Sequence, residues 1–88
     1  MVLSSNYEIV EIADELLAVP VGKMANICKD VFTFNDAAAA LVKQLKTQST
    51  QRELIDLLVG QYEIDDQTAA EDVNKFVSTL LSYGLIDQ

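Results

Sequence analysis

Few side chains in this chain of 88 residues could do chemistry. It contains one cysteine, Cys28, and no histidine. Lys23 and Lys29 lie near Cys28 in the sequence and would favour its thiolate form. Without an imidazole, however, the chain has no Ser–His or Cys–His pair that could activate a nucleophile. We therefore expect Cys28 to be a small, partly buried loop residue, and the sequence predicts no catalytic residues and no enzyme.

Metal and phosphate sites are not indicated either. A structural zinc site needs four Cys or His ligands. The acidic segment 63–66 lacks the alternating ligands, the central glycine and the distal glutamate of a calcium-binding loop, so helix capping and solvated charge explain it better. Acid pairs of the kind that glycosidases use occur in any acidic chain. The three glycines Gly22, Gly60 and Gly84 are isolated, which excludes a glycine-rich phosphate loop. We expect no metal and no cofactor.

The net charge restricts the partners. Fourteen acids against six bases give −8. Nucleic acids bind proteins through Lys and Arg, and anionic membranes repel an acidic chain, so both are poor partners. No apolar run approaches the roughly 20 residues that span a bilayer. Residues 1–6 lack the features of a signal peptide, and a single cysteine allows no internal disulfide. These features predict a cytoplasmic protein.

The N-terminal part of the chain predicts β-strands. Three short segments are rich in β-branched and aromatic residues, and Asp14-Glu15 is a candidate two-residue turn between the first two. Pro20 has no N–H group to donate, so the second strand ends there or lies at an edge. In the third strand, Phe32 and Phe34 share one face. The expected strands are Tyr7–Ala13, Leu16–Val19 and Val31–Phe34.

The rest of the chain predicts three helices. Asn35 is a good N-cap for the first, and Thr50 with Glu53 forms a capping box for the second. Gly60 lies near the end of the second helix. The third begins at Asp65 and buries a stripe of apolar residues. Gly84 fits the left-handed position after its C-terminus, where Leu85 would meet Leu80 in a Schellman motif. The predicted apolar stripe of the third helix contains Ala69, Val73, Phe76, Val77 and Leu80.

The order of these elements predicts an α+β fold. Three N-terminal antiparallel strands precede three helices, and the second and third helices could form a helix-turn-helix pair. The arrangement is winged helix-turn-helix-like, with the strands ahead of the helices. We expect residues 1–6 to be a flexible N-terminus and residues 7–88 to be a single domain.

A winged helix usually suggests DNA binding, but the third helix argues against it. Glu63, Asp65 and Asp66 precede or open it, and Glu71 and Asp72 follow, against one base, Lys75. Recognition of a peptide or protein remains. An extended peptide could add a strand along Val31–Thr33. An ordinary short edge strand explains the same residues equally well.

Several short phrases stand out along the chain: Phe32–Asp36, Gln61–Asp65, Ala70, Asp72-Val73, Phe76-Val77 and Tyr83–Ile86. In these phrases the chain resembles the PqqD-like family, which is named for pyrroloquinoline quinone biosynthesis protein D. The resemblance spans about residues 7–86, and it depends on the order and spacing of several phrases rather than on one of them. The departures are Ala37-Ala38 and Val42, where many relatives carry Thr-Gly and an aromatic residue. They change packing more than the binding edge, so the fold transfers better than the peptide specificity.

This resemblance implies a leader-peptide recognition element. Such a protein binds the leader segment of a ribosomally made precursor peptide as a strand added to its third strand. It presents that peptide to a maturation enzyme, such as a radical SAM enzyme or a leader peptidase. An acidic winged-helix transcription regulator and a structural subunit of an enzyme complex remain alternatives. The resemblance places the peptide-binding residues at Val31, Phe32, Thr33, Phe34, Asp72, Lys75, Phe76 and Thr79; Phe76 also fits the core stripe.

Overall fold

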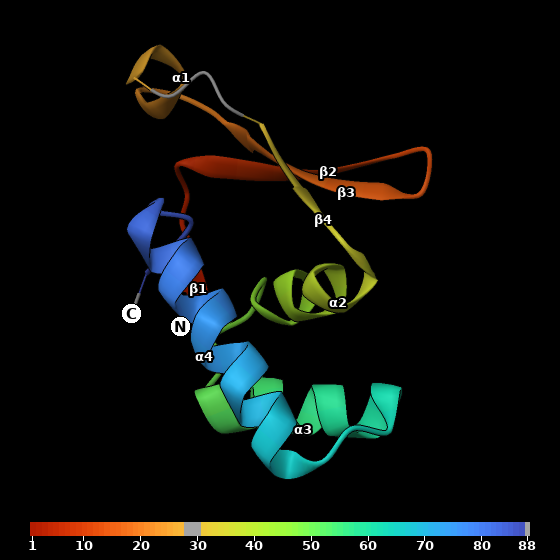
Figure 1. The fold of residues 1–88 in the computed structure, drawn as a ribbon. Coiled ribbons are helices and arrows are strands. Elements are labelled where there is room, and N and C mark those ends of the chain that lie inside the picture. Colours follow the sequence, from red (N-terminus) through yellow and green to blue (C-terminus); the bar gives the residue numbers. More distant parts are fainter. Residues whose placement is uncertain (28–30, 88) are drawn as a thin grey trace.

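The computed structural model describes residues 1–27 and 31–87 and shows an α+β fold (Figure 1). A three-stranded antiparallel sheet has the order β2-β3-β4. The three predicted strands are confirmed, although Val31 lies just outside the third. Because β3 pairs with both neighbours, β4 is an edge strand, as the sequence predicts. The strands are β2 (Tyr7–Ile12), β3 (Glu15–Pro20) and β4 (Phe32–Phe34).

The turn between β2 and β3 differs from the predicted one. Ile12 pairs with Glu15, so the two turn residues are Ala13 and Asp14, and the predicted turn at Asp14-Glu15 is wrong. Both turn residues have positive φ, 51° and 68°. Positive φ at both central positions is the signature of a type I′ turn, whose twist matches that of the flanking strands. The twist of the hairpin therefore determines the position and type of the turn. Ala13 adopts an unfavourable left-handed conformation as a result.

Four helices are described, one more than predicted. The short α1 lies in the connection between β3 and β4, where the sequence shows no amphipathic pattern. The winged helix-turn-helix character of the arrangement stays a prediction. None of the described helices has the combined length and apolarity that crossing a bilayer requires. The helices are α1 (Met24–Ile27), α2 (Asp36–Gln44), α3 (Gln51–Tyr62) and α4 (Asp66–Ser82).

The predicted N-caps are confirmed. The Asn35 side chain accepts a hydrogen bond of 2.8 Å from the Ala38 N–H group. Thr50 and Glu53 form the expected reciprocal capping box. Asp65 accepts a bond of 2.7 Å from the Thr68 N–H group, and this bond lowers the pKa of its carboxyl. Each cap satisfies backbone donors that the first helical turn leaves without partners.

The acidic residues before α4 have structural partners. Asp66 forms an ion pair with Arg52 of α3, which also pairs with Asp56. These bonds lower the pKa of Asp66 and raise that of Arg52. All three side chains are largely exposed, so the pairs contribute little to stability. With Asp65 as a cap, this agrees with the predicted capping and solvated charge.

The C-terminus of α4 is the predicted Schellman motif. The Leu85 N–H group donates to the Leu80 carbonyl at 2.9 Å, and the Gly84 N–H group donates to the Leu81 carbonyl at 3.1 Å. Gly84 has a φ of 72°, an angle that residues with a Cβ atom rarely adopt. By contrast, Gly60 lies inside α3, which ends two residues later at Tyr62 and is followed by Glu63 in the left-handed region.

Two glycine substitutions are expected to change stability in opposite directions. Gly84→Ala should lower the free energy of unfolding by about 1–2 kcal/mol, because alanine is strained at positive φ. Gly60→Ala should raise it by about 0.5–1 kcal/mol, because alanine is the better helix former. A Cβ meets no atom within 4 Å at either position, so the comparison isolates backbone conformation. Urea unfolding measures both values, and equal signs would contradict the assignment.

The two ends of the described chain lie side by side (Figure 1). β1 (Val2–Leu3) pairs with β5 (Ile86–Asp87). The Leu3 N–H group donates to the Leu45 carbonyl, and the Ser4 N–H group donates to the Leu85 carbonyl, both at 2.9 Å. These bonds involve residues 1–6, for which the sequence predicts flexibility. The division into a flexible segment and a domain stays a prediction.

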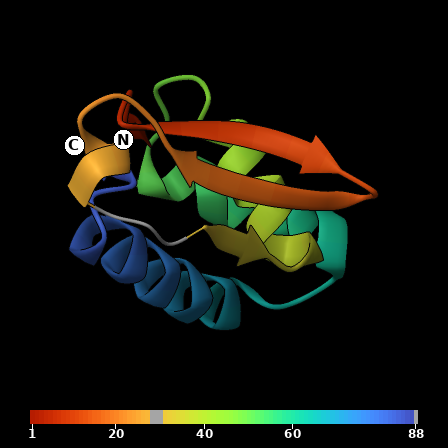
Figure 2. The same ribbon diagram turned by 90° about the horizontal axis from the view of Figure 1, so that it is seen from above.

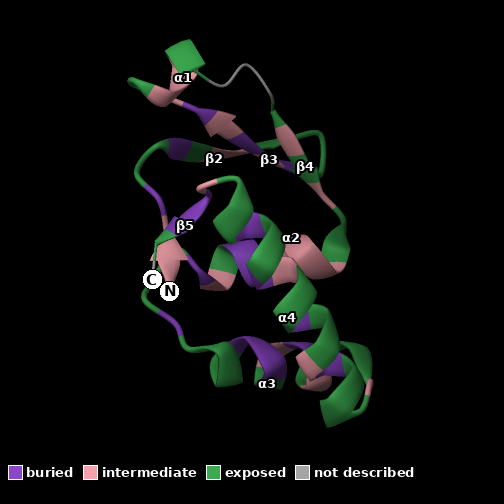
Figure 3. Ribbon diagram, turned by 60° about the vertical axis from the view of Figure 1, so that its left-hand side comes forward, coloured by how far each residue is buried: buried purple, intermediate pink, exposed green. Residues whose placement is uncertain are grey.

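The hydrophobic core lies between the sheet and the three long helices. Buried residues line the inner faces of these helices, while their outer faces are exposed (Figure 3). The apolar stripe predicted for α4 is buried except for Phe76, which is half-buried. The core therefore holds α4 against the rest of the domain and leaves one of its faces beside the edge strand. The fully buried large side chains are Leu45, Leu54, Leu85, Val42 and Val73.

Candidate functional site

An apolar groove separates the edge strand from α4. Figure 2 shows β4 between β3 and α4 in the view from above. The groove has a volume of about 380 Å³. Its lining comes from β4, from the start of α2 and from the C-terminal half of α4. The lining residues are Phe32, Thr33, Phe34, Asn35, Ala38, Lys75, Phe76, Thr79, Leu80, Tyr83 and Leu85.

The groove brings together six of the eight peptide-binding residues expected from the sequence, and their role in binding stays a prediction. Of the other two, Val31 lies before β4 and is 51% exposed. Asp72 lies one helical turn before Phe76 and lines an adjoining pocket. Phe76 was expected in the core or in the site; it packs half-buried against the core and also lines the groove. The six are Phe32, Thr33, Phe34, Lys75, Phe76 and Thr79.

Tyr83 is the most prominent groove residue that the sequence reasoning missed. Its ring lies 4.8 Å from that of Phe32, and Phe32 in turn meets Tyr7 edge-on at 6.0 Å. The Tyr7 hydroxyl donates to the Tyr83 carbonyl at 3.1 Å. Tyr83 is nevertheless 53% exposed. Its spacing after Thr79 and Phe76, four and seven residues, places it on the same helix face and would have identified it.

The backbone of Thr33 faces away from the sheet. The Val21 N–H group donates to the Asn6 carbonyl at 2.9 Å, which continues the register of β2 and β3. In an antiparallel pair the backbone groups of successive residues point to opposite sides. The N–H and C=O groups of the odd-numbered residues of β3 therefore point to β2, and those of Leu16 and Ala18 point to β4. Their partners are Phe34 and Phe32. The N–H and C=O groups of Thr33, between them, point to the free edge.

Among the described residues, the lining of the groove has a single charged side chain, and it forms no ion pair. Lys75 is the charged residue of the lining, and it is exposed. Within the described part of the chain, neither Lys75 nor Asp72 forms an ion pair. The Thr79 hydroxyl donates to the Lys75 carbonyl at 2.9 Å. The groove therefore offers an apolar floor, a backbone edge and one free cation, and it suits an extended chain with apolar side chains.

A second pocket continues the groove toward the N-terminal half of α4. It has a volume of about 330 Å³ and shares Asn35, Ala38 and Phe76 with the groove. Its floor is formed by Leu41 and Leu58, which are buried in the core. Ala37 and Asp72 complete the lining.

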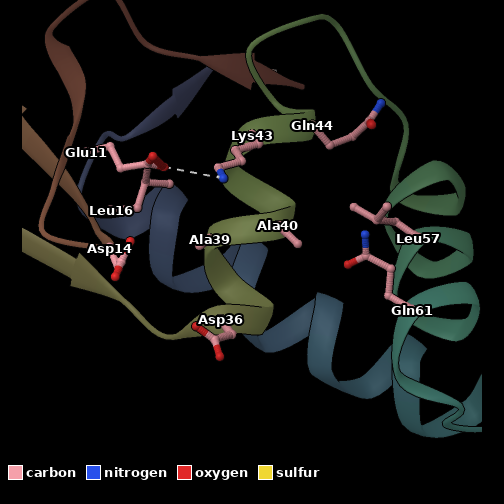
Figure 4. Close-up of a pocket in the computed structure, with 10 residues that line it drawn as sticks. All are labelled: Glu11, Asp14, Leu16, Asp36, Ala39, Ala40, Lys43, Gln44, Leu57 and Gln61. Carbon is pink, nitrogen blue, oxygen red and sulfur yellow. Dashed lines mark ion pairs between the residues drawn. The ribbon is translucent and has the colours of Figure 1, made fainter.

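A third pocket lies on the other side of α2, between α2, α3 and the β2–β3 turn (Figure 4). Its volume is about 510 Å³. Lys43 Nζ and Glu11 Oε1 form an ion pair of 3.5 Å across its mouth, and Asp14 and Asp36 add two further carboxylates. This pocket is more polar than the groove.

The described residues contain no cluster of three or more His, Cys, Asp or Glu side chains that could hold a metal ion. Cys28 and Lys29, the candidate nucleophile and its neighbour, lie outside the described residues.

Known proteins resemble this chain in sequence and in fold. The family model of coenzyme PQQ synthesis protein D (PqqD) matches residues 16–86. The structure of TbiB1 in complex with the TbiA(beta) leader peptide has a TM-score of 0.83 at 18% identity, covering 99% of this chain and 95% of that one. Lasso peptide synthetase B1 complexed with the leader peptide has a TM-score of 0.77 at 18% identity, covering 94% and 92%. No curated protein matches the sequence. Both structures share the fold described above.

Proposed function

Because the chain belongs to the coenzyme PQQ synthesis protein D family, we propose that it binds the leader segment of a ribosomally made precursor peptide. It presents this peptide to a maturation enzyme, such as a radical SAM enzyme or a leader peptidase. The observation that carries the proposal is the apolar groove between the free edge of β4 and α4. Two proteins of the same fold, TbiB1 and lasso peptide synthetase B1, are complexed with leader peptides.

The peptide binds as a fourth strand of the sheet. Main-chain hydrogen bonds to Thr33 give affinity that does not depend on the peptide's sequence, and side-chain pockets give specificity. Every second side chain of the added strand points toward the domain. Those side chains contact Phe76 and Tyr83 in the groove, whose lining is mainly apolar. Aromatic side chains bury large areas and commonly dominate binding energy at interfaces.

The protein acts as an adaptor rather than as a catalyst, and it works in the cytoplasm, where precursor peptides are synthesised. The absence of histidine removes the commonest general acid and base from the chain. The winged helix-turn-helix-like arrangement serves peptide binding. The exposed face of α4 carries Glu71 and Asp72 beside Lys75, a balance that disfavours contact with phosphates.

A titration followed by NMR tests the proposal. The precursor peptide encoded beside this gene is added to isotopically labelled protein, and backbone amide signals are recorded. We expect shifts at residues 32–34 and along α4 at Lys75, Phe76, Thr79 and Tyr83. Ala39 and Ala40, which line the pocket on the other side of α2, serve as the internal control and should not shift. Shifts confined to the pocket that Ala39 and Ala40 line, or no shift at all, would refute leader binding in the groove.

A further inference from the structure

We infer that the pocket between α2, α3 and α4 is a second subsite for the same leader peptide. It takes one apolar side chain, and a lysine or arginine next to that side chain pairs with Asp72. This inference rests on the proposed function, and it adds a sequence requirement that binding to the β4 edge does not impose.

The two pockets form one continuous path. Asn35, Ala38 and Phe76 line both of them. The stretch from Asp72 of α4 to its C-cap Tyr83 spans twelve residues, and the helical rise between the two ends is about 16 Å. β4 has three residues, so it provides roughly 10 Å of edge. After β4 the protein's own chain turns away from the sheet edge at Asn35, which is the N-cap of α2. A peptide that lies along α4 therefore extends beyond the end of β4. It continues past Phe76 into the second pocket.

The second pocket has the chemistry of a site for one apolar side chain. Leu41 and Leu58 form a rigid floor, because each is 3% exposed and belongs to the packed core. Ala37 and Ala38 leave the pocket open, because a larger side chain at either position would fill part of it. Phe76 lines both this pocket and the groove. An aliphatic side chain the size of leucine would bury its surface there and gain binding energy.

The charges at the two pockets have opposite signs. Asp72 lines the second pocket and Lys75 lines the groove, three residues apart on one face of α4. Neither has an ion-pair partner among residues 1–27 and 31–87. A base over Asp72 is attracted both by this carboxylate and by the net charge of −8. Complementary charges of this kind fix the register of a partner more than they raise its affinity.

A displayed library of random peptides of about ten residues, enough to span both pockets when extended, tests the inference. Peptides are selected separately on the unchanged protein and on the Thr33→Pro variant. Those that bind the unchanged protein but not the variant need the β4 edge, and they are kept. We expect them to share an apolar residue adjacent to a lysine or arginine. Their affinities are then measured for Ala37→Leu and Asp72→Lys. Ala40→Leu and Glu71→Lys are the matched controls, since the same changes occur on the same helices outside this pocket.

The results separate the two claims. Ala37→Leu should weaken binding of the selected peptides about tenfold, as expected from losing one buried aliphatic side chain, while Ala40→Leu leaves it unchanged. Selection on Asp72→Lys should remove the enrichment of bases, while selection on Glu71→Lys keeps it. Edge-dependent peptides that tolerate both pocket variants and lack the basic residue would overturn the second subsite alone. A library without any edge-dependent binder would overturn the proposed function and this inference together. Circular dichroism checks that each variant is folded.

Discussion

Replacing Thr33 with proline should weaken leader-peptide binding by about tenfold to a hundredfold while the domain stays folded. The N–H group of Thr33 points to the free edge, so proline removes a donor that the added strand would use. Its ring also occupies the space of the incoming backbone. A lost hydrogen bond that leaves its partner unsatisfied costs about 1–3 kcal/mol, and each 1.4 kcal/mol is a factor of ten in affinity.

The matched control is Thr33→Ala, which removes the exposed side chain but keeps the N–H group. It should bind within about twofold of the unchanged protein, since the Thr33 side chain is exposed. Fluorescence anisotropy with the labelled precursor peptide measures both affinities. Proline is tolerated on edge strands when its nitrogen faces outward, so urea unfolding should show that the Thr33→Pro domain is intact. Unchanged binding by a folded Thr33→Pro protein would exclude strand addition at β4.

Replacing Leu54 with alanine should lower the free energy of unfolding by about 2–5 kcal/mol. Leu54 is 0% exposed and belongs to the core cluster with Leu45, Leu58 and Val73. Its truncation removes buried apolar surface and leaves a cavity that rigid helices cannot close. Small domains are stable by only about 5–15 kcal/mol, so this loss is a large share of the total.

The matched control for the core is Leu81→Ala on α4. Leu81 is 37% exposed, so the same truncation should cost less than about 1 kcal/mol. Urea unfolding followed by circular dichroism compares the two variants. Equal losses would mean that the packing of α3 against the core differs from the structure described here.

Local chemistry explains why the helices could be predicted. The caps at Asn35, Thr50 and Asp65 and the Schellman motif at Gly84 all form within a few residues of the chain. The same holds for most apolar stripes, because a period of 3.6 residues specifies which face is buried. The exception lies at the groove. Phe76 belongs to the apolar stripe predicted for α4, yet it lines the groove.

Features that depend on distant partners were missed or misplaced. The turn at Ala13-Asp14 follows from the twist of two paired strands rather than from turn propensity. β1 and β5 are two residues long and join the two ends of the chain, so no periodicity announces them. Tyr83 reaches the groove because Phe32, fifty-one positions earlier in the sequence, lies against its ring.

Sequence reasoning alone was enough to predict the α+β class, the starts of the three long helices, an edge position for the third strand and an acidic surface that disfavours nucleic acid. Each of these follows from residue type, short-range spacing or total charge. Three features required the folded structure: β4 and α4 enclose one groove, the backbone groups of Thr33 point outward, and Asp72 lines the adjoining pocket rather than the groove. These facts depend on sheet register and on how helices pack, which bring together residues that are far apart in the chain.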